Sequence, residues 1–483
     1  MKHAILILAH KNIGQLCRLA EYFKHDCDVF IHIDRKQTIK SIEKERILGL
    51  KQVKFISQEY DVNWGGTSVL ESEMHLLRLS IHYSDANYFH LISGQDYPTR
   101  PLEYFLDFFK RNIGKEFISY LHLPHPNWQD NTFQRLQYYY PYDYSSKQKN
   151  PRQWVREQVR LQQKRGIKRP IPDEFDHLYG SSQWFSITRD ASIALLDYTD
   201  HSPSLYRKMW MTFAPEECYV ATVLVNLMGK KNIISWNHRF IRWQYENGNR
   251  PANLGNEHFR YLLENEYVFA RKMELPISNQ LLDRIDKYLH KDNRIELDST
   301  GGWIYNGFLK YKYDTRFAEY VMQMWHRTEA KFGLDMGCGA GLYVAKWRDC
   351  GLSFAGYDAN PHTTELSSML LPDDDLPCEV ADLTKELEIE DKFDIVVCKD
   401  VLPYIPTELE DVAIRNLTKL SGRFIILSWD VPEEKRELPH RDISEETLLG
   451  LMKKEKFEKE KYMTTDLRVL LNRKNCCVLT KQE

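Results

Sequence analysis

The chain lacks the features that mark membrane-spanning, disulfide-bonded and zinc-binding proteins. No stretch approaches the ~20 consecutive apolar residues that a membrane-spanning helix needs. The apolar run after Met1 and Lys2 is too short for a secretory signal peptide, and no small-residue cleavage site follows it. Nine cysteines are scattered without C-x-x-C spacing, which predicts neither a zinc site nor a disulfide framework. We therefore expect a cytoplasmic protein.

The balance of residue types is that of a soluble globular protein with room for two domains. Hydrophobic residues make up 42% of the 483 residues and charged residues 28%, with a net charge of −3. A chain of this length can fold two domains of ordinary size, each with its own core. Internal repeats and low-complexity tracts are absent. The acidic net charge and the lack of a nucleic-acid-binding motif argue against a nucleic-acid partner.

A glycine-rich loop two-thirds of the way along the chain predicts a nucleotide site. An apolar strand over residues 332–336 contains Asp335, and three glycines at alternate positions follow it. These glycines are Gly337, Gly339 and Gly341. Glycines let the backbone approach a ligand closely before the next helix begins. A second strand, residues 352–357, is followed by Asp358, where a carboxylate can bind ribose hydroxyls.

The spacing of the glycines distinguishes two classes of cofactor. A dinucleotide fingerprint needs Gly-x-Gly-x-x-Gly, but Leu342 occupies the third glycine position here. The sequence from Asp335 onward instead reads acid-x-Gly-x-Gly-x-Gly, which resembles the first motif of class I S-adenosylmethionine-dependent methyltransferases. A helix over residues 313–330 is expected to pack over the cofactor site. The alternative is a glycine turn in an unrelated α/β unit.

Three later segments resemble the same methyltransferase family. Residues 380–383 match the segment whose acid, here Asp382, meets the adenine amino group. Residues 393–402 match the fourth strand and the loop after it, which contains Asp400, and the β-rich run 423–429 matches the fifth strand. The resemblance covers residues 300 to 483 and implies a Rossmann-like fold that binds S-adenosylmethionine. The binding residues that it implies are Asp335, Gly337, Gly339, Gly341, Asp358, Asp382 and Asp400.

Strands and helices alternate in the first hundred residues. Apolar strands are expected at residues 4–9, 28–33, 53–56 and 88–92, with helices at 13–23 and after residue 66. This order predicts a parallel, doubly wound α/β sheet. In such sheets the ligand binds outside the carboxyl ends of the strands, so polar residues there are candidate site residues. They are His10, Asp34 and the turn 93–96, which contains Asp96; a packed strand-end histidine is the alternative for His10.

Seven short motifs in the first 275 residues occur in the order seen in one glycosyltransferase family. They lie at residues 5–11, 31–34, 64–66, 91–98, 180–185, 214–217 and 267–272. Together they resemble the core-2/I-branching β-1,6-N-acetylglucosaminyltransferase and peptide O-xylosyltransferase family. The resemblance implies a GT-A-like fold and inverting, metal-independent transfer of N-acetylglucosamine or xylose from a UDP donor. Residues 32–34 read His-Ile-Asp rather than Asp-x-Asp, which agrees with metal independence.

Inverting sugar transfer needs one carboxylate that takes the proton from the acceptor hydroxyl. The resemblance assigns this catalytic base to Glu217, the second acid of an Ala-Pro-Glu-Glu motif. Glu216 stands where the family often has Asp. The alternative is that Glu217 only caps or flanks the helix after Pro215.

The leaving diphosphate needs cationic side chains when no metal is present, because negative charge grows on its oxygens. The resemblance gives this role to Arg239 and Lys272. Arg242 competes with Arg239, which is an ordinary surface cation in the alternative interpretation. Asp34 matches the residue that contacts uracil, and Trp184 is placed in the donor or acceptor pocket. The predicted donor-binding residues are His10, Asp34, Asp96, Ser181, Trp184, Arg239, Arg242 and Lys272.

A basic segment, residues 147–169, separates two of these motifs. It holds nine Lys or Arg against one acid, Glu157. Pro151 can start a helix in which several apolar residues lie on one side. These are Trp154, Val155, Val159 and Leu161. Two interpretations are open. In the first, the segment is a membrane-surface helix at the inner face of the cytoplasmic membrane, which would suit a glycan acceptor on a lipid pyrophosphate. In the second, it is a solvated helix that packs on the domain.

A polar run, residues 291–302, separates the two halves. We place a GT-A-like domain at residues 1–294 and a methyltransferase domain at 295–483. The linkage predicts a bifunctional enzyme of surface polysaccharide synthesis that adds a sugar and then methylates the same glycan, on oxygen. The alternatives are a C-terminal half that is structural or regulatory, a C-terminal half that methylates another substrate, and an N-terminal half that binds carbohydrate without turnover. The candidates for a base in methyl transfer are Asp400, Tyr404, His440 and Arg441.

Overall fold

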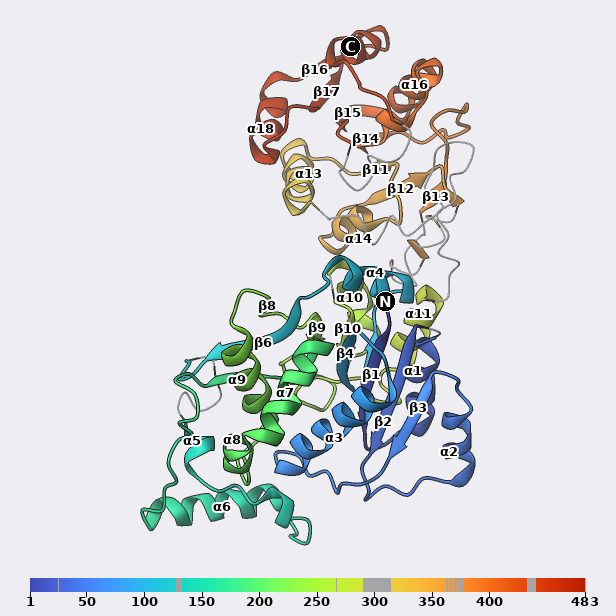
Figure 1. The fold of residues 1–483 in the computed structure, drawn as a ribbon. Coiled ribbons are helices and arrows are strands. Elements are labelled where there is room, and N and C mark those ends of the chain that lie inside the picture. The colour runs from blue at the N-terminus through green and yellow to red at the C-terminus, as the bar shows by residue number, and fades with distance from the viewer. Residues whose placement is uncertain are drawn as a thin grey trace. The chain divides into compact units, whose positions relative to one another are not determined.

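The structure is a computed structural model. It describes residues 1–24, 26–126, 128, 133–265, 267–289, 314–361, 364, 367–368, 371, 378–431 and 440–482. The chain divides into two compact units, Met1–Leu289 and His290–Glu483, and Figure 1 shows the elements of each. The boundary predicted between residues 294 and 295 lies outside the described residues.

The first unit is built on a seven-stranded sheet with the order β3-β2-β1-β4-β7-β6-β8. Its strands are β1 (His3–Ala9), β2 (Cys27–Ile33), β3 (Val53–Ser57), β4 (Tyr88–Ser93), β6 (Glu116–His122), β7 (Tyr179–Thr188) and β8 (Ile233–Ile234). Strands β1 to β4 run parallel, which confirms the prediction from the sequence. Strand β7 is antiparallel to both β4 and β6 and extends the sheet in a way that the alternation did not predict.

Helices cover both faces of this sheet because its central strands are apolar on both sides. Ala4 and Leu6 of β1 belong to a core cluster with Leu70 and Met74, which lie on the first of three helices on that face. These helices are α3 (Thr67–Tyr83), α7 (Arg189–His201) and α9 (Glu216–Met228), which lie together in Figure 1. The helices α1 (Ile13–Tyr22), α2 (Ser41–Leu48) and α4 (Leu102–Arg111) complete the α/β layers.

A small three-stranded sheet joins distant parts of the chain in this unit. Its strands are β5 (Asp96–Pro98), β10 (Phe269–Arg271) and β9 (Arg239–Ile241). The central strand β10 is antiparallel to β5 and parallel to β9, and its Arg271 stands opposite both Asp96 and Ile241. Two sequence motifs more than 170 residues apart therefore meet in this sheet. Shorter elements follow: α5 (Gln134–Gln137), η1 (Tyr142–Tyr144), α8 (Ser204–Lys208), η2 (Asn256–His258), α10 (Phe259–Glu264) and α11 (Asn279–Leu289).

The basic segment forms helix α6 (Pro151–Lys164). The side chain of Asn150 caps its N-terminus by accepting a hydrogen bond from the backbone N–H of Gln153. Val155 and Val159 are buried, so the apolar side of the helix packs on the unit, whereas Leu161 is 43% exposed. Within the described ranges, no helix is long and apolar enough to cross a membrane.

The second unit contains another seven-stranded sheet, with the order β13-β12-β11-β14-β15-β17-β16. Its strands are β11 (Gly333–Met336), β12 (Phe354–Asp358), β13 (Glu379–Val380), β14 (Phe393–Lys399), β15 (Ser421–Ser428), β16 (Phe457–Lys459) and β17 (Cys476–Lys481). All pairs up to β15 are parallel, and β17 is antiparallel to β15 and β16. Strands β12, β14 and β15 begin within a few residues of the predicted strands, whereas β16 was not predicted.

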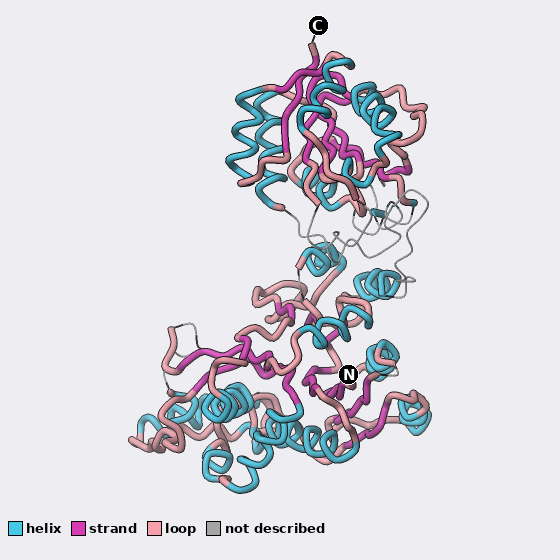
Figure 2. The backbone as a smooth tube through the Cα atoms, turned by 45° about the horizontal axis from the view of Figure 1, so that its top comes forward, coloured by secondary structure: helices cyan, strands magenta, loops and turns pink. Residues whose placement is uncertain are grey.

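Separate apolar clusters cover the two faces of this second sheet. Figure 2 shows its strands between helices on either side. The helices are α13 (Thr315–Thr328), α14 (Leu342–Asp349), α16 (Glu410–Leu420), α17 (Glu445–Lys454) and α18 (Lys461–Leu471). The helix predicted over residues 313–330 is α13, which packs against α14 and α18. All nine cysteines of the chain are free thiols.

Candidate functional site

The carboxyl ends of β1, β2 and β4 form one edge of the first sheet. The backbone N–H of Asp34, after β2, donates to the carbonyl of Ala9 at 2.9 Å. The N–H of Gly94, after β4, donates to the carbonyl of Leu8 at 2.8 Å. These bonds hold the loops after adjacent parallel strands side by side, so His10 and Asp34 lie at the edge where doubly wound sheets bind ligands.

His10 and Asp34 share this edge with positive charge. Asp34 is buried, and its Oδ1 accepts hydrogen bonds from the backbone N–H groups of Lys36 (3.1 Å) and Val62 (3.2 Å). Desolvation lowers the pKa of His10, and two nearby lysines, one of them Lys272, lower it further, while Asp34 opposes them. His10 is therefore neutral near pH 7 and can donate or accept a hydrogen bond.

Arg271 contacts two of the predicted donor-binding residues, Trp184 and Asp96. Its guanidinium lies over the ring of Trp184, 4.1 Å from the ring centre, and its Nε is 3.4 Å from Asp96 Oδ1. The other oxygen of Asp96 accepts a hydrogen bond from the backbone N–H of Ser93 at 2.6 Å. Desolvation lowers the pKa of Arg271, whereas Asp96 and Glu217 raise it. The sequence prediction named the next residue, Lys272, and missed Arg271, although both belong to the same motif.

The start of β7 lines the same edge with small and polar residues. The hydroxyl of Ser181 is buried, and no hydrogen-bond partner for it exists among the residues that the structure describes. Gln183 donates from Nε2 to Oε1 of Glu73 at 2.8 Å. A Cβ at Gly180 would lie 2.5 Å from the ring of Trp128, so only glycine allows this ring to pack on the strand. The glycine of the motif therefore has a steric role.

Glu217 lies in the first turn of α9 and pairs with a buried arginine. Its Oε2 accepts a hydrogen bond from Nη1 of Arg135 at 3.0 Å, and its side chain is 31% exposed. The guanidinium of Arg135 lies 4.4 Å from the ring centre of Trp128 and 5.1 Å from that of Phe213. No side chain caps α9. The contacts of Glu217 therefore do not support the alternative that it caps this helix. No sequence signal pointed to Arg135.

Two further acids lie beneath Glu217. Glu216 and Glu73 are buried, and one carboxyl oxygen of each has no hydrogen-bond partner in the described part of the chain. Desolvation, together with the charge of Glu217, raises the pKa of Glu216 to about 8. Desolvation also raises the pKa of Glu73 well above its ordinary value, with a further contribution from Glu216. Glu216 is thus mainly protonated at neutral pH, burial favours the protonated form of Glu73, and Glu217 is the acid with solvent access.

The contacts of Arg239 do not support its predicted role on the diphosphate. Its guanidinium is buried and donates to the carbonyls of Asn237 (2.6 Å), Phe185 (2.6 Å) and Leu91 (3.2 Å). Desolvation lowers its pKa to about 9. The arginine thus stabilises internal carbonyl groups and is not free to bind a ligand. Its competitor Arg242 pairs with a glutamate at 2.8 Å on the surface.

No three His, Cys, Asp or Glu side chains within the described ranges come close enough to hold a metal ion. The metal independence of the transfer stays a prediction.

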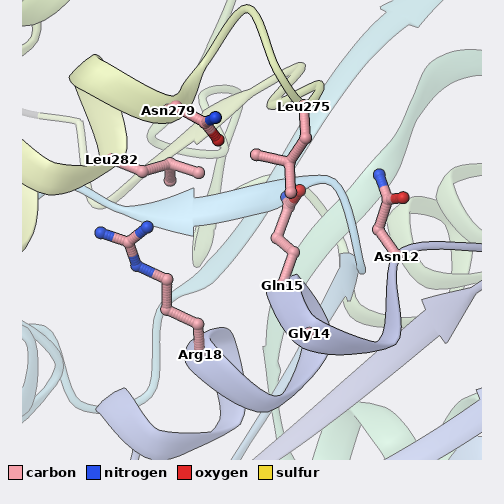
Figure 3. A pocket seen from close by; sticks show the side chains of 7 residues that line it. All are labelled: Asn12, Gly14, Gln15, Arg18, Leu275, Asn279 and Leu282. Carbon is pink, nitrogen blue, oxygen red and sulfur yellow. The ribbon is translucent and has the colours of Figure 1, made fainter.

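A pocket of about 350 Å³ lies beside this edge, between α1 and α11 (Figure 3). It is lined by Asn12, Gly14, Gln15, Arg18, Leu275, Asn279 and Leu282. Gln15 is buried and donates from Nε2 to the carbonyl of Gly94 at 3.2 Å, while Arg18 pairs with Asp286 at 2.6 Å. None of the predicted donor-binding residues lines this pocket.

The glycine loop of the second unit has the backbone that the sequence predicted. The φ angles of Gly337, Gly339 and Gly341 are +82°, +54° and +79°, a region that favours glycine. A Cβ at Gly337 would lie 2.2 Å from Val401, and one at Gly341 would lie 2.8 Å from Cys378 Sγ. A Cβ at Gly339 would meet nothing within 4 Å. The outer two glycines therefore provide space for neighbouring side chains, and the middle one faces open space.

Two acids lie next to this loop, and Asp358 bonds to its backbone. Asp358 accepts hydrogen bonds from the backbone N–H groups of Gly339 at 2.8 Å and Asn360 at 2.9 Å. Asp335 is buried, and desolvation together with the nearby Asp358 raises its pKa to about 7, while Lys399 opposes the rise. The carboxylate predicted to bind ribose thus already contacts the loop predicted to bind the cofactor.

Asp382 and Asp400 use their oxygens within the protein. Asp382 accepts hydrogen bonds from the backbone N–H of Thr384 (2.9 Å) and from its hydroxyl (2.6 Å). Asp400 is buried, pairs with Lys399 at 2.6 Å and accepts a hydrogen bond from the Ser428 hydroxyl at 2.7 Å. Desolvation would raise the pKa of Asp400, but these partners lower it below its ordinary value. This geometry does not support the proposed roles of Asp400 in binding the cofactor or accepting a proton.

The other candidate bases for methyl transfer gain little support. Arg441 donates to the carbonyl of Ile405 at 2.7 Å and pairs with Glu410 at 2.8 Å, which fixes a loop after β14. Desolvation raises the pKa of Tyr404. His440 is exposed at the border of the described residues. The contacts therefore identify no base for methyl transfer.

Comparison with known families finds a match in each unit. Residues 4–263 match the core-2/I-branching enzyme family, and residues 334–426 match a methyltransferase domain. The fold and these matches therefore define a glycosyltransferase unit followed by a methyltransferase unit with a Rossmann-like fold. The chain belongs to the core-2/I-branching enzyme family.

Individual relatives resemble one unit or the other. Xylosyltransferase 2 from Pan troglodytes and from Homo sapiens are each 24% identical to this chain over 321 residues. The matches cover 59% of this chain and 33% of those proteins, so the chain spans about a third of their length.

Solved methyltransferases resemble the second unit at low identity. Magnesium protoporphyrin IX methyltransferase from Synechocystis PCC 6803 is 20% identical, with a TM-score of 0.28, over 35% of this chain and 79% of that one. The amino pentose methyltransferase CalS10 from Micromonospora echinaspora is 14% identical, with a TM-score of 0.28, over 35% of this chain and 92% of that one.

Proposed function

We propose that the first unit transfers a sugar from a UDP donor to a glycan hydroxyl with inversion at the anomeric carbon. The observation that carries this proposal is the arrangement of Glu217 and Arg271. Inversion needs a carboxylate near the acceptor hydroxyl and cations near the leaving diphosphate. Glu217 is solvent-accessible and close enough to Arg271 to raise its pKa. On this basis we assign the acid and the cation to one site.

Each remaining group has a role in this proposal. Arg271 and Lys272 bind the diphosphate, and Asp96 keeps the Arg271 guanidinium in place. Asp34 and His10 lie where the nucleoside would bind, at the ends of β2 and β1. Because the relatives are xylosyltransferases, UDP-xylose is the first donor to test and UDP-N-acetylglucosamine the second.

The proposal is tested by the substitution Glu217→Gln, which keeps the shape of the side chain and removes the base. We expect UDP release from the donor, measured with a glycan acceptor panel, to fall by about 10²-fold to 10⁴-fold. Binding of UDP, measured by calorimetry, should stay close to that of the wild type. Glu45→Gln, at an exposed position within α2, is the matched control. Unchanged UDP release in Glu217→Gln would exclude Glu217 as the base.

We infer that the second unit binds S-adenosylmethionine at its glycine loop and methylates the same glycan on oxygen. The open space at Gly339 and the adjacent Asp358 support the cofactor assignment. The physical linkage of the two units supports a shared glycan and a role in surface polysaccharide synthesis. The cofactor would supply the methyl group, while the loop and Asp358 would hold its amino-acid and ribose parts.

Transfer of radiolabelled methyl groups tests this second activity. The glycan is offered before and after reaction with the UDP-sugar, and we expect label only, or mainly, in the glycosylated product. Asp358→Ala should abolish the label, and mild base should not release it if the methyl is an ether. Cofactor binding without transfer to any glycan would favour the alternatives, a regulatory unit or a different substrate.

We also propose that the end of α6 meets an anionic membrane that carries a lipid-linked acceptor. This basic surface consists of the exposed residues Leu161, Lys164, Arg165, Ile167 and Lys168. Cations beside exposed apolar groups suit a surface of anionic lipid headgroups. Location in the cytoplasm, at the inner face of the cytoplasmic membrane, is the corresponding proposal.

Vesicle sedimentation tests the basic surface. The full chain should bind phosphatidylglycerol vesicles more than phosphatidylcholine vesicles, and added salt should weaken the binding. Replacing Lys164, Arg165 and Lys168 by Glu should abolish it. The same change at Lys453, Lys454 and Lys456, which are also exposed, is the control. Equal binding by both triple variants and the wild type would contradict the proposal.

A further inference from the structure

The first turn of α6 lies beside the candidate catalytic site. Arg152, the second residue of this helix, places its guanidinium 4.4 Å from the ring centre of Trp64. The Trp64 ring packs on Phe213, with 5.5 Å between the ring centres. Phe213 in turn lies 5.1 Å from Arg135, the partner of Glu217. A continuous series of side-chain contacts thus joins Arg152 to the candidate base.

Arg152 also lies close to the cations of the donor site. Desolvation lowers the pKa of Lys272 most, the charges of Arg271, Lys11 and Arg152 lower it further, and Glu274 opposes them. Across the described residues, neither Arg152 nor Lys272 makes a side-chain hydrogen bond or an ion pair with an acid. Arg271 is paired with Asp96, but Arg152 and Lys272 form no ion pair within that part of the chain. Like charges repel, so these two neighbouring cations are suited to an anionic ligand.

The position of Arg152 is fixed by elements that are themselves well packed. Val155 and Val159, one and two turns further along α6, are buried against the unit. Asn150 caps the helix directly before it. The guanidinium rests on Trp64, which is 59% exposed, so the stacked side chain remains accessible to solvent. An arginine that is ordered before a ligand binds loses less conformational entropy on binding.

We propose that Arg152 is a third cation for the donor diphosphate, supplied by the basic segment and additional to Arg271 and Lys272. This inference rests on the proposed function of the first unit. A guanidinium presents a planar set of N–H donors that matches phosphate oxygens, and a ligand with several negative charges offsets the repulsion among the three cations. The basic segment then has two parts: the first turn of α6 binds the donor, and the far end makes the proposed membrane contact.

Calorimetric titration of the full chain with UDP tests this assignment. Arg152→Ala should weaken UDP binding about tenfold, the scale of one charge-assisted hydrogen bond, without changing the melting temperature of the unliganded protein. Arg152→Lys, which keeps the charge but not the planar group, should lose less affinity. Arg160→Ala is the matched control, since Arg160 is an exposed arginine two turns further along the same helix.

The possible outcomes separate this inference from the proposed function. If the wild type and Arg152→Ala bind UDP equally, Arg152 is not a donor residue, and the proposed function stands. If Arg160→Ala loses as much affinity as Arg152→Ala, the effect belongs to the overall charge of the helix, and the inference is wrong. If the wild type does not bind UDP, the proposed function fails, and the role of Arg152 fails with it.

Discussion

At the level of single residues, surroundings distinguish the acids near the start of α9. Glu217 has solvent access and a cationic partner, whereas Glu216 and Glu73 are buried. Neighbouring carboxyls of the same chemical type therefore differ in solvent access, and only Glu217 can reach an acceptor hydroxyl and take its proton. The sequence motif names two adjacent acids; their burial decides between them.

The buried carboxyl of Glu216 should make stability depend on pH. Its pKa is about 8 in the folded protein against an ordinary value of 4.5, so between these values the folded state holds a proton that the unfolded chain has lost. The Glu216 carboxyl therefore lowers the free energy of unfolding progressively as the pH rises from about 4.5 to about 8. Above this range its effect is constant. Glu216→Gln should gain stability relative to the wild type between pH 5 and 8, by at least about 1 kcal/mol.

Thermal or urea unfolding of both proteins across this pH range measures the difference. Comparing variant with wild type removes the contributions of other titrating groups. A stability difference that stays constant from pH 5 to pH 8 would contradict the assigned pKa.

Substitution of Arg135, the buried partner of Glu217, should affect turnover more than donor binding. Arg135→Met keeps much of the side-chain volume between Trp128 and Phe213 but removes the hydrogen bond to Glu217. We expect kcat to fall about tenfold or more, because a carboxylate without its partner is less well positioned. The Kd for UDP should change little. Arg135→Lys should recover part of kcat, and a fall in UDP affinity equal to the fall in kcat would argue against a positioning role.

At the level of elements, Gly337 and Gly339 in the loop after β11 are expected to have different roles. Alanine at Gly337 would place its Cβ 2.2 Å from Val401 at a φ of +82°, so we expect Gly337→Ala to destabilise the second unit. Alanine at Gly339 would meet no atom within 4 Å, so its cost to stability should be only about 1 kcal/mol of backbone strain. Its Cβ would nevertheless occupy the space assigned to the cofactor.

Melting temperature and S-adenosylmethionine affinity, measured on both variants, separate these tasks. Gly339→Ala should lose affinity with little change in melting temperature, and Gly337→Ala should lose both. Gly450→Ala, within α17 and with open space around its Cβ, is the control and should not lose stability. Unchanged cofactor affinity in Gly339→Ala would exclude the loop as the binding site.

The sequence predicts the elements whose pattern is local. Strands β1 to β4, helix α1 and the glycine loop are found where apolar alternation, glycine spacing and turn residues placed them. Residues that act through long-range contacts carry no such signal. Arg135 comes from a four-residue helix and reaches Glu217 only through tertiary packing.

Arg239 and Arg271 show most clearly that the sequence alone does not predict long-range contacts. Family resemblance named Arg239, but the fold buries its guanidinium among carbonyl groups. Arg271, by contrast, is directed by its pairing opposite Asp96 towards the site. The pairing of neighbouring strands determines where each arginine side chain lies, and this pairing cannot be read from the local sequence.

At the level of the whole molecule, each candidate site is built from residues of one unit. Lys272 and its neighbours belong to the first unit and Asp358 to the second. We therefore expect Lys272→Ala to weaken UDP binding without changing S-adenosylmethionine binding, and Asp358→Ala to do the reverse. Calorimetry with both ligands on both variants measures this. If either substitution weakened both ligands, the two sites would not be independent.

Hydrogen exchange of the full chain with each ligand tests the central claim of two separate nucleotide sites most directly. UDP should protect backbone amides at residues 10–15, 93–96 and 269–272, and S-adenosylmethionine should protect residues 336–342. Protection by each ligand confined to its own unit is the predicted result. The account would be contradicted if neither ligand protected these segments, or if both protected the same unit.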